Sequence, residues 1–245
     1  MKKKTFKPKK GILVLIDGID GSGKTTALAA LFSWAKKKKL KILDLRKALK
    51  RSYPSLKELK KYDLLISVEP SLGGIGQVLR KEFLRRDKGY SAKSCAEAFA
   101  LDRLLLYQRV IIPALKLKKI IFQDRGISST LAYQPIQKEK ISLKKILSLK
   151  GNQLALKYPP HLLIITQIDP QIAFKRLKGR KNKRDHALFE KLSFLKKLAK
   201  RFSSPWFRKF FEKKGTQVIY LDTQGEIKTT KKKVIEIWEK FLKKK

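Results

Sequence analysis

The residues best suited to chemistry stand in a short glycine-rich segment near the start of the chain. Their spacing is G-x-x-x-x-G-K-[ST], and they are Gly18, Ile19, Asp20, Gly21, Ser22, Gly23, Lys24, Thr25 and Thr26. Glycines let the backbone bend so that successive N–H groups converge on phosphate oxygens. Lys24 supplies a positive charge there, and the Thr25 hydroxyl is a ligand for Mg²⁺. The segment predicts a binding site for a nucleoside triphosphate.

The sequence on either side of this segment has the elements that such a site requires. Residues 12–16 are an apolar run typical of a buried strand, and residues 23–35 have the pattern of a helix. The N-terminus of that helix adds its positive dipole end to the same anion. A plain glycine turn is the alternative. A phosphate-binding motif must follow a strand and begin a helix, and because both elements are expected here, the phosphate site is favoured.

Strands and helices alternate along the rest of the chain, which is typical of an α/β fold. We expect a three-layer structure in which helices flank a parallel sheet of about five strands. The segments with strand character are 11–17, 40–45, 63–68, 119–123, 161–168 and 217–221. The expected helices are 23–35, 75–84, 92–117, 128–134, 143–156, 170–177, 188–213 and 228–243. Pro113 is expected to bend or interrupt one of them.

Charged residues follow several of the expected strands, where parallel α/β sheets bind their ligands. Asp17 ends the first strand, Glu69-Pro70 follows the third, and Asp124-Arg125 follows the fourth. A carboxylate at Asp124 can hold Mg²⁺ through water, and Arg125 can hold a phosphate with two parallel hydrogen bonds. A surface ion pair is the alternative at any one strand end. Charged residues that could bind a ligand follow two of the strands, which makes coincidence less probable and favours a binding site.

Phe99 and Arg103 are four residues apart in an expected helix, so they project from the same face. An aromatic ring can stack on a base while a guanidinium donates a hydrogen bond to the base's oxygen. A core phenylalanine beside a surface arginine is the alternative for this pair taken alone. Arg80 is likewise only a basic helix residue until other evidence places it.

A dense cationic stretch spans residues 175–184 and contains Gly179. Such a segment can close over phosphates as a lid, stabilise the charge of a transferring phosphoryl group and exclude water. A solvated basic loop is the alternative, and charge alone supports the two equally.

The composition is strongly basic, with a formal net charge of +41 over 245 residues. The lysine runs are spread along the chain without interleaved aromatic residues, which favours a solvated surface over a dedicated nucleic-acid site. Weak, salt-sensitive adhesion to nucleic acid is expected. A single cysteine, Cys95, excludes an intramolecular disulfide and fits a cytoplasmic location. No apolar run reaches the ~18 residues of a membrane span, and no membrane association is expected.

The organisation that we expect is simple. Residues 1–10 form a basic N-terminal arm, and residues 11–245 form a single domain, because no internal repeat or long linker divides them. Within the domain, a lid covers about residues 176–188, and an extra lysine-rich segment covers about residues 44–62.

Together, the order and spacing of these residues resemble thymidylate kinase, a nucleoside monophosphate kinase with the P-loop NTPase fold. The matching segments are 16–26, Glu69-Pro70 with Gly76 and Arg80, 99–103, Asp124-Arg125 with 128–134, 168–170 with Ala173 and Arg176, and Phe189-Glu190. The resemblance covers nearly the whole chain, and several motifs in register make it specific.

The resemblance implies transfer of the γ-phosphoryl group of ATP, as its Mg²⁺ complex, to dTMP, in a homodimeric enzyme. On this mapping Phe99 stacks on thymine, Arg103 reaches its exocyclic oxygen, and Arg80 and Arg125 hold the acceptor phosphate. The other acceptor-side residues are Asp20 near the sugar 3′-hydroxyl, Tyr133 where a ribose 2′-hydroxyl would sit, and Glu69, Thr130 and Gln134 in the same pocket. The expected metal ligands are Thr25, Asp17 and Asp124.

The catalytic cations that the resemblance implies are Lys24, Arg125 and an arginine of the lid. Residues 18–24 contain no arginine, so the lid supplies it, and the candidates are Arg176, Arg180 and Arg184. No general base is needed, because the acceptor phosphate is already anionic and the task is alignment and charge neutralisation.

Three positions depart from the usual pattern of the family. Asp17 stands where the family usually has glutamate, Val68 where it has arginine, and Gly126 where it has tyrosine. The last two remove contacts near the acceptor, so a kinase for another deoxynucleotide or deoxynucleoside is the nearest alternative. A nucleic-acid-binding P-loop protein with a vestigial site is the alternative from a different class.

Overall fold

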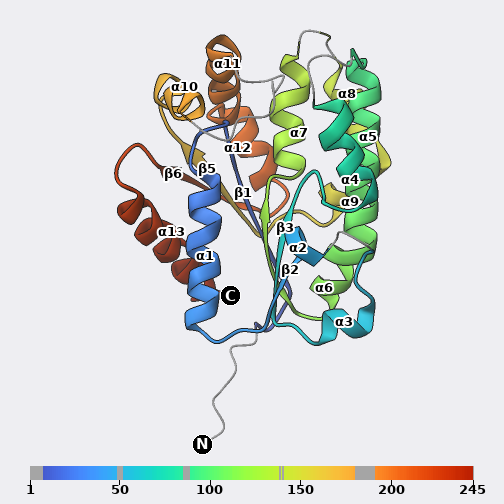
Figure 1. Cartoon of the computed structure of the whole chain (residues 1–245), viewed down its shortest axis with the longest axis vertical. Helices are drawn as coiled ribbons and strands as arrows, with labels where there is room; N and C mark the ends of the chain where they lie inside the picture. The colour runs from blue at the N-terminus through green and yellow to red at the C-terminus, as the bar shows by residue number, and fades with distance from the viewer. Residues whose placement is uncertain are drawn as a thin grey trace, which may run out of the picture.

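Six parallel strands form one sheet in the order β2-β3-β4-β1-β5-β6 (Figure 1). The computed structural model describes residues 8–48, 52–84, 89–137, 139, 141–179 and 191–244. The strands are β1 Ile12–Gly18, β2 Ile42–Asp44, β3 Leu64–Val68, β4 Ile120–Asp124, β5 Leu162–Gln167 and β6 Gln217–Asp222. The expected α/β fold is confirmed, but the expected count of about five strands is too low, since both edge strands pair with a neighbour.

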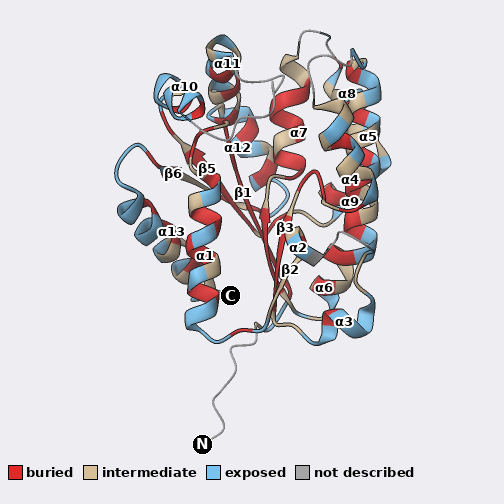
Figure 2. Ribbon diagram, viewed as in Figure 1, coloured by how far each residue is buried: buried red, intermediate tan, exposed pale blue. Residues whose placement is uncertain are grey.

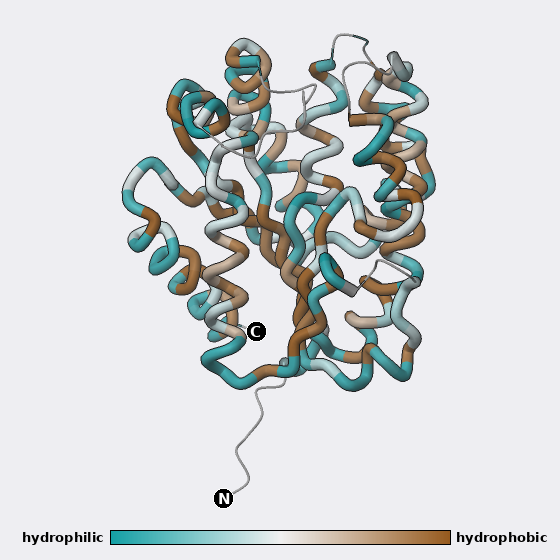
Figure 3. Tube along the Cα trace, viewed as in Figure 1, coloured by the Kyte–Doolittle hydropathy of each residue, from teal (hydrophilic) through white to brown (hydrophobic). Residues whose placement is uncertain are grey.

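The strands are apolar on both sides because both faces of the sheet are covered. Every residue of β1 is buried (Figure 2). Leu13 and Leu15 belong to the core on one face, and Val14 and Ile16 belong to the core on the other. The alternation follows from the two-residue period of a strand, and Figure 3 shows the hydrophobic segments gathered in the sheet.

Two helices cover one face of the sheet, α1 (Lys24–Lys37) and α13 (Ile227–Leu242) (Figure 1). Their contact is built on aromatic rings, because Trp238 lies edge-on to Trp34 at 5.5 Å and to Phe122 of β4 at 5.0 Å between ring centroids. This packing fixes the direction of α1 and so the aim of its N-terminus.

The other helices include those that cover the opposite face. They are α2 Leu45–Ala48, α3 Leu56–Lys60, α4 Gly74–Val78, α5 Ala92–Leu106, α6 Ile112–Lys116, α7 Ile127–Tyr133, α8 Leu143–Ser148, α9 Lys150–Lys157, α10 Pro170–Lys178, α11 Leu192–Phe202 and α12 Pro205–Glu212. Single π turns follow α4 at Leu79–Phe83 and α5 at Tyr107–Ile111, and a 3₁₀ turn follows α7 at Gln134–Ile136.

Prolines and caps divide three of the expected helices. The expected helix 92–117 changes to a π turn before Pro113, which has no N–H to donate to the preceding turn. The expected helix 188–213 ends at Phe202, and Ser204 caps a new helix by accepting a hydrogen bond from the Phe207 N–H at 3.2 Å. The expected helix 143–156 breaks at Leu149, whose backbone is extended.

The lysine-rich segment 44–62 contains two short helices where it is described, α2 and α3. Ser55 and Glu58 form a capping box at the start of α3. Tyr53 of this segment lies beside Gly73 in the turn after β3, where a Cβ would be 3.4 Å from the Tyr53 hydroxyl. Part of the segment thus packs beside the turn that follows Glu69-Pro70. Among the described residues, no helix is long and apolar enough to cross a membrane.

Candidate active site

The glycine-rich segment forms the turn between β1 and α1, at the carboxyl end of the sheet. Gly21 and Gly23 have φ values of 81° and 85°, which favour glycine. A Cβ on Gly21 would also lie 2.5 Å from the carbonyl oxygen of Ala173 in α10. The turn therefore brings backbone N–H groups and the N-terminus of a 14-residue helix together at one point, as an anion site requires.

Lys24 lies across the inside of this turn. Its Nζ donates hydrogen bonds to the carbonyl oxygens of Gly18 at 3.0 Å and Ile19 at 2.7 Å, and it lies 3.8 Å from Asp20 Oδ1. Burial and the positive charge of Arg125 outweigh the nearby carboxylates and lower the pKa of Lys24 to about 8. A polyanion placed in the turn would restore the charged form.

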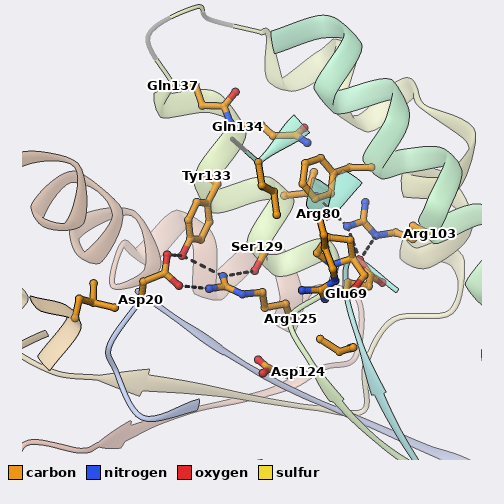
Figure 4. A pocket seen from close by; sticks show the side chains of 17 residues that line it. Asp20, Glu69, Arg80, Arg103, Asp124, Arg125, Ser129, Tyr133, Gln134 and Gln137 are labelled. Carbon is orange, nitrogen blue, oxygen red and sulfur yellow. Dashed lines mark hydrogen bonds and ion pairs between the residues drawn. The ribbon is translucent and has the colours of Figure 1, made fainter. Parts of the chain in front are cut away.

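Arg125 connects the turn to the helix α7 beyond β4. It donates to Tyr133 Oη at 3.1 Å and to Ser129 Oγ at 3.4 Å, and it forms an ion pair with Asp20 (Figure 4). The Tyr133 hydroxyl donates in turn to Asp20 Oδ2 at 3.0 Å. Burial opposes ionisation of Asp20, but the charges of Arg125 and Lys24 outweigh it and lower the pKa of that carboxyl. The Arg125 guanidinium and the Asp20 carboxylate are thus held together beside the glycine-rich turn.

The two carboxylates expected to bind metal have different surroundings. Asp17 is fully buried, and its oxygens accept hydrogen bonds from the Gly18 N–H and from the hydroxyls of Ser128 and Ser129. These hydrogen bonds brace β1 against α7, and a metal-binding role for Asp17 stays a prediction. Asp124 has a buried Oδ1 with no hydrogen-bond partner among the described residues. An unpartnered buried carboxylate oxygen at this edge fits a divalent cation.

The side chain of Arg103 on α5 is buried rather than exposed on the surface. Its Nε and Nη2 both donate to Glu69 Oε2, at 2.9 and 2.6 Å, and Nη2 also donates to Thr130 Oγ1 at 2.9 Å. Gln123 donates to the other oxygen of Glu69 at 3.0 Å. Burial raises the pKa of Glu69, and Arg103 opposes that rise. The structure thus brings together three residues expected at the acceptor site.

A cavity of about 420 Å³ opens beside the turn. Of the residues expected from the sequence, it is lined by Asp20, Glu69, Arg80, Phe99, Arg103, Asp124, Arg125, Thr130, Tyr133 and Gln134. Figure 4 shows these side chains, with Arg80 and Gln134 among those labelled, around one space. Gln134 Oε1 is buried and has no hydrogen-bond partner among the described residues. Leu84 and Gln137 also line the cavity, although no sequence motif indicated them.

The two departures on the acceptor side, Val68 and Gly126, also line this cavity. A Cβ on Gly126 would lie 2.9 Å from Leu15 Cδ1 and 3.2 Å from Gln123 Nε2. A tyrosine at this position would therefore displace both side chains. Glycine here lets Gln123 reach the carbonyl oxygen of Arg125 at 3.0 Å.

Of the three expected lid arginines, the structure describes Arg176. Arg176 is exposed in α10 and donates to the carbonyl oxygens of Thr223 at 3.2 Å and Gln224 at 3.4 Å, so it contacts the loop after β6 rather than the pocket. Arg180, Arg184 and the Phe189-Glu190 match lie outside the described residues. Thr223 donates through Oγ1 to the carbonyl oxygen of Ser22 at 2.9 Å, which ties the same loop to the phosphate-binding turn.

A phosphate-binding turn and a second pocket rich in arginine share one edge of a parallel sheet, and this arrangement defines a P-loop nucleoside monophosphate kinase. Residues 45–234 match the family model for thymidylate kinase. By this match, which spans more than half of the chain, the protein belongs to the thymidylate kinase family.

Individual relatives agree with the family model. The thymidylate kinase of Aster yellows witches'-broom phytoplasma is 31% identical over 191 residues, which cover 77% of this chain and 80% of the relative. That of Caldicellulosiruptor saccharolyticus is 29% identical over 239 residues, 96% of this chain and 99% of the relative. The crystal structure of thymidylate kinase from Ehrlichia chaffeensis has the same fold, with a TM-score of 0.61 and 20% identity over 94% of this chain and 99% of that one.

The low pKa of Lys24 predicts a pH dependence of donor binding. The free enzyme should lose kcat/KM for ATP as the pH rises through about 8, because deprotonated Lys24 no longer neutralises phosphate. Bound ATP raises the lysine pKa, so kcat should fall only at higher pH. Steady-state profiles from pH 6.5 to 10 measure both limbs. Lys24→Arg, which stays charged, should remove the fall of kcat/KM for ATP near pH 8. A wild-type kcat/KM that is constant through pH 9 would show that Lys24 does not titrate there.

Proposed function

We propose that this protein transfers the terminal phosphoryl group of ATP to dTMP, giving ADP and dTDP. The observation that carries the proposal is the shared position of Asp20 and Arg125. Asp20 belongs to the phosphate-binding turn and also lines the second pocket, and Arg125 is paired to it at that junction. A donor phosphate at Lys24 and an acceptor phosphate in the pocket would then meet at one cation.

The pocket suits the hydrogen-bonding edge of thymine. An arginine has five N–H hydrogens, and described residues accept four from Arg103, which leaves one on Nη1 as a donor. Gln134 Oε1 is an unpartnered acceptor in the same cavity. Thymine offers a carbonyl oxygen beside a ring N–H, which matches this donor and acceptor. Cytosine offers an amino group beside an acceptor nitrogen, which would leave both protein groups unpaired.

The proposed chemistry is alignment and charge neutralisation at this junction. Lys24 and Arg125 lie where the charges of the donor and acceptor phosphates would otherwise repel each other. Thr25 and Asp124 are the groups that would hold Mg²⁺, which when bound would withdraw charge from the donor phosphates. A lid arginine is proposed to complete the cation set, and Arg176, Arg180 and Arg184 remain its candidates.

Phe99→Ala is expected to weaken acceptor binding. A stacked base gains about 1–3 kcal/mol from an aromatic partner, so KM for dTMP should rise by roughly 5- to 150-fold. KM for ATP should stay within about twofold, since Phe99 lines the acceptor cavity and is not part of the phosphate-binding turn. Phe32→Ala, on α1 and away from the cavity, is the matched control. An unchanged KM for dTMP would remove Phe99 from the acceptor site.

A coupled assay for ADP formation with a panel of acceptors tests the proposed activity. The panel is dTMP, dUMP, dCMP, dGMP and thymidine, each with ATP and Mg²⁺. We expect the highest kcat/KM for dTMP, and little turnover of dCMP because of the donor and acceptor pattern. A clear preference for another monophosphate, or for the nucleoside, would replace dTMP as the substrate.

We also propose a homodimeric, cytoplasmic enzyme, on the support of its family membership. The net charge of +41 favours non-specific adhesion to nucleic acid. Filter binding to DNA at two salt concentrations tests whether that adhesion is a function. Binding lost at the higher salt is expected, and specific binding that survives it would favour the nucleic-acid-binding alternative.

A further inference from the structure

Asn152 is a fully buried amide at the first turn of α9, and no motif in the sequence pointed to it. Its Nδ2 donates to the carbonyl oxygen of Ile146 at 2.7 Å, and its Oδ1 accepts a hydrogen bond from Arg103 Nη1. A carbonyl only accepts and a guanidinium only donates, so one orientation of the amide satisfies both partners. The backbone of α8 therefore fixes which way the Asn152 oxygen faces.

This oxygen completes the restraint of the Arg103 guanidinium. Glu69 and Thr130 accept the Nε hydrogen and both Nη2 hydrogens. Asn152 holds the remaining nitrogen, Nη1. Because one side of the planar group is held by Glu69 and the other by Asn152, the guanidinium cannot turn without losing charge-assisted hydrogen bonds. The one N–H that no described residue accepts then has a fixed direction.

The approach of α9 to α5 depends on the residue before Asn152. A Cβ on Gly151 would lie 1.8 Å from the carbonyl oxygen of Ala100 and 3.0 Å from the backbone nitrogen of Leu104. Only glycine lets the start of α9 rest on the backbone of α5 at this point. The contacted residues, Ala100 and Leu104, directly follow Phe99 and Arg103, which line the acceptor cavity.

We propose that Asn152 is a positioning residue for acceptor recognition: it holds the free Nη1–H of Arg103 in line with the base's exocyclic oxygen. The inference rests on the proposed function, because it assigns that N–H to the acceptor base. Asn152 itself contacts no substrate. It acts by keeping the guanidinium from swinging about its bond to Glu69, so its removal affects only acceptors that use the oxygen.

The test compares dTMP with an acceptor that has no oxygen for the Arg103 Nη1–H. That acceptor is the 5′-monophosphate of the 5-methyl-2-pyrimidinone deoxynucleoside, which lacks O4 and, with it, the N3 hydrogen. The loss of the N3 hydrogen is the same in the unaltered protein and in each variant, so comparing the change that a substitution causes for each acceptor isolates the contact with O4. Asn152→Ala should lower kcat/KM for dTMP by about tenfold or more, the loss of a well-aligned hydrogen bond to a charged donor. It should change kcat/KM for the analogue by less than about threefold and leave KM for ATP unaltered. Gln153→Ala, at the exposed neighbour, is the matched control.

Two further variants keep the test decisive. Asn152→Leu retains the side-chain volume if the alanine variant does not fold, and it carries the same expectation. Asn152→Asp still offers an oxygen to Arg103 and should preserve more of the preference for dTMP over the analogue than alanine does. Equal losses for both acceptors, or no loss for dTMP, would overturn the inference. Absence of dTMP turnover in the unaltered protein would instead overturn the proposed function.

Discussion

Replacing Lys24 by alanine should lower kcat by about 10²–10³-fold or more, the range for removal of one group that stabilises transition-state charge in a water-excluded site. In the structure the Lys24 ammonium is buried in the phosphate-binding turn, within 3.0 Å of two loop carbonyl oxygens. No other lysine among the described residues lies in that turn. The donor phosphates would therefore lose the lysine charge that the turn supplies.

The variant should fold normally, which separates this effect from a loss of structure. Burial already disfavours the Lys24 ammonium, and Asp20 keeps its pairing with Arg125 when the lysine is removed. We expect a thermal midpoint within a few degrees of the unaltered protein. Lys37→Ala, at the exposed far end of the same helix, should have normal turnover. Turnover of Lys24→Ala within tenfold of normal would contradict the role given to the turn.

Replacing Arg103 by methionine should cost both stability and acceptor binding. Arg103 is 1% exposed and its partner Glu69 is 4% exposed, so the substitution leaves a buried carboxylate with Gln123 as its side-chain donor. Breaking a buried ion pair from one side typically costs about 3–5 kcal/mol. Urea unfolding measures that loss. KM for dTMP should rise sharply in the same variant, because the donor to the base is gone.

A second substitution divides the two effects. Adding Glu69→Gln to Arg103→Met removes the unpaired charge and should restore much of the lost stability, while KM for dTMP stays high. Phe122→Leu, a core change on the opposite face of the sheet, should lower stability without a comparable change in KM for dTMP. An Arg103→Met protein with normal stability and normal KM would show that the buried pair has neither role.

Local patterns in the sequence predicted the parts of the site that depend on local geometry. The phosphate-binding turn needs glycines at fixed spacing, and strand ends bring Glu69 and Asp124 to one edge in any parallel sheet. These follow from periodicity and turn chemistry alone. All six strand segments lie close to their expected positions for the same reason.

The missed features depend on contacts between distant segments. Asn152 stands in an ordinary helical pattern, and its role appears only when Gly151 brings α9 against α5. The hydroxyls of Ser128 and Ser129, far along the chain, donate hydrogen bonds to the Asp17 carboxylate, and nothing in the sequence around Asp17 indicated these partners. Arg103 was expected at the base, and its burial against Glu69 adds a structural role. Periodicity does not encode such partners.

We expect the donor and acceptor phosphates to meet end to end between Lys24 and Arg125. Calorimetric titration with a bisubstrate molecule, adenosine and thymidine joined through their 5′-oxygens by one polyphosphate chain, tests it most directly. We predict one molecule bound per chain, about 10²-fold or more tighter than ATP or dTMP alone, displaced by an excess of either nucleotide and weakened by Lys24→Ala and by Arg125→Ala. Binding no tighter than that of ATP, with no displacement by dTMP, would contradict the account.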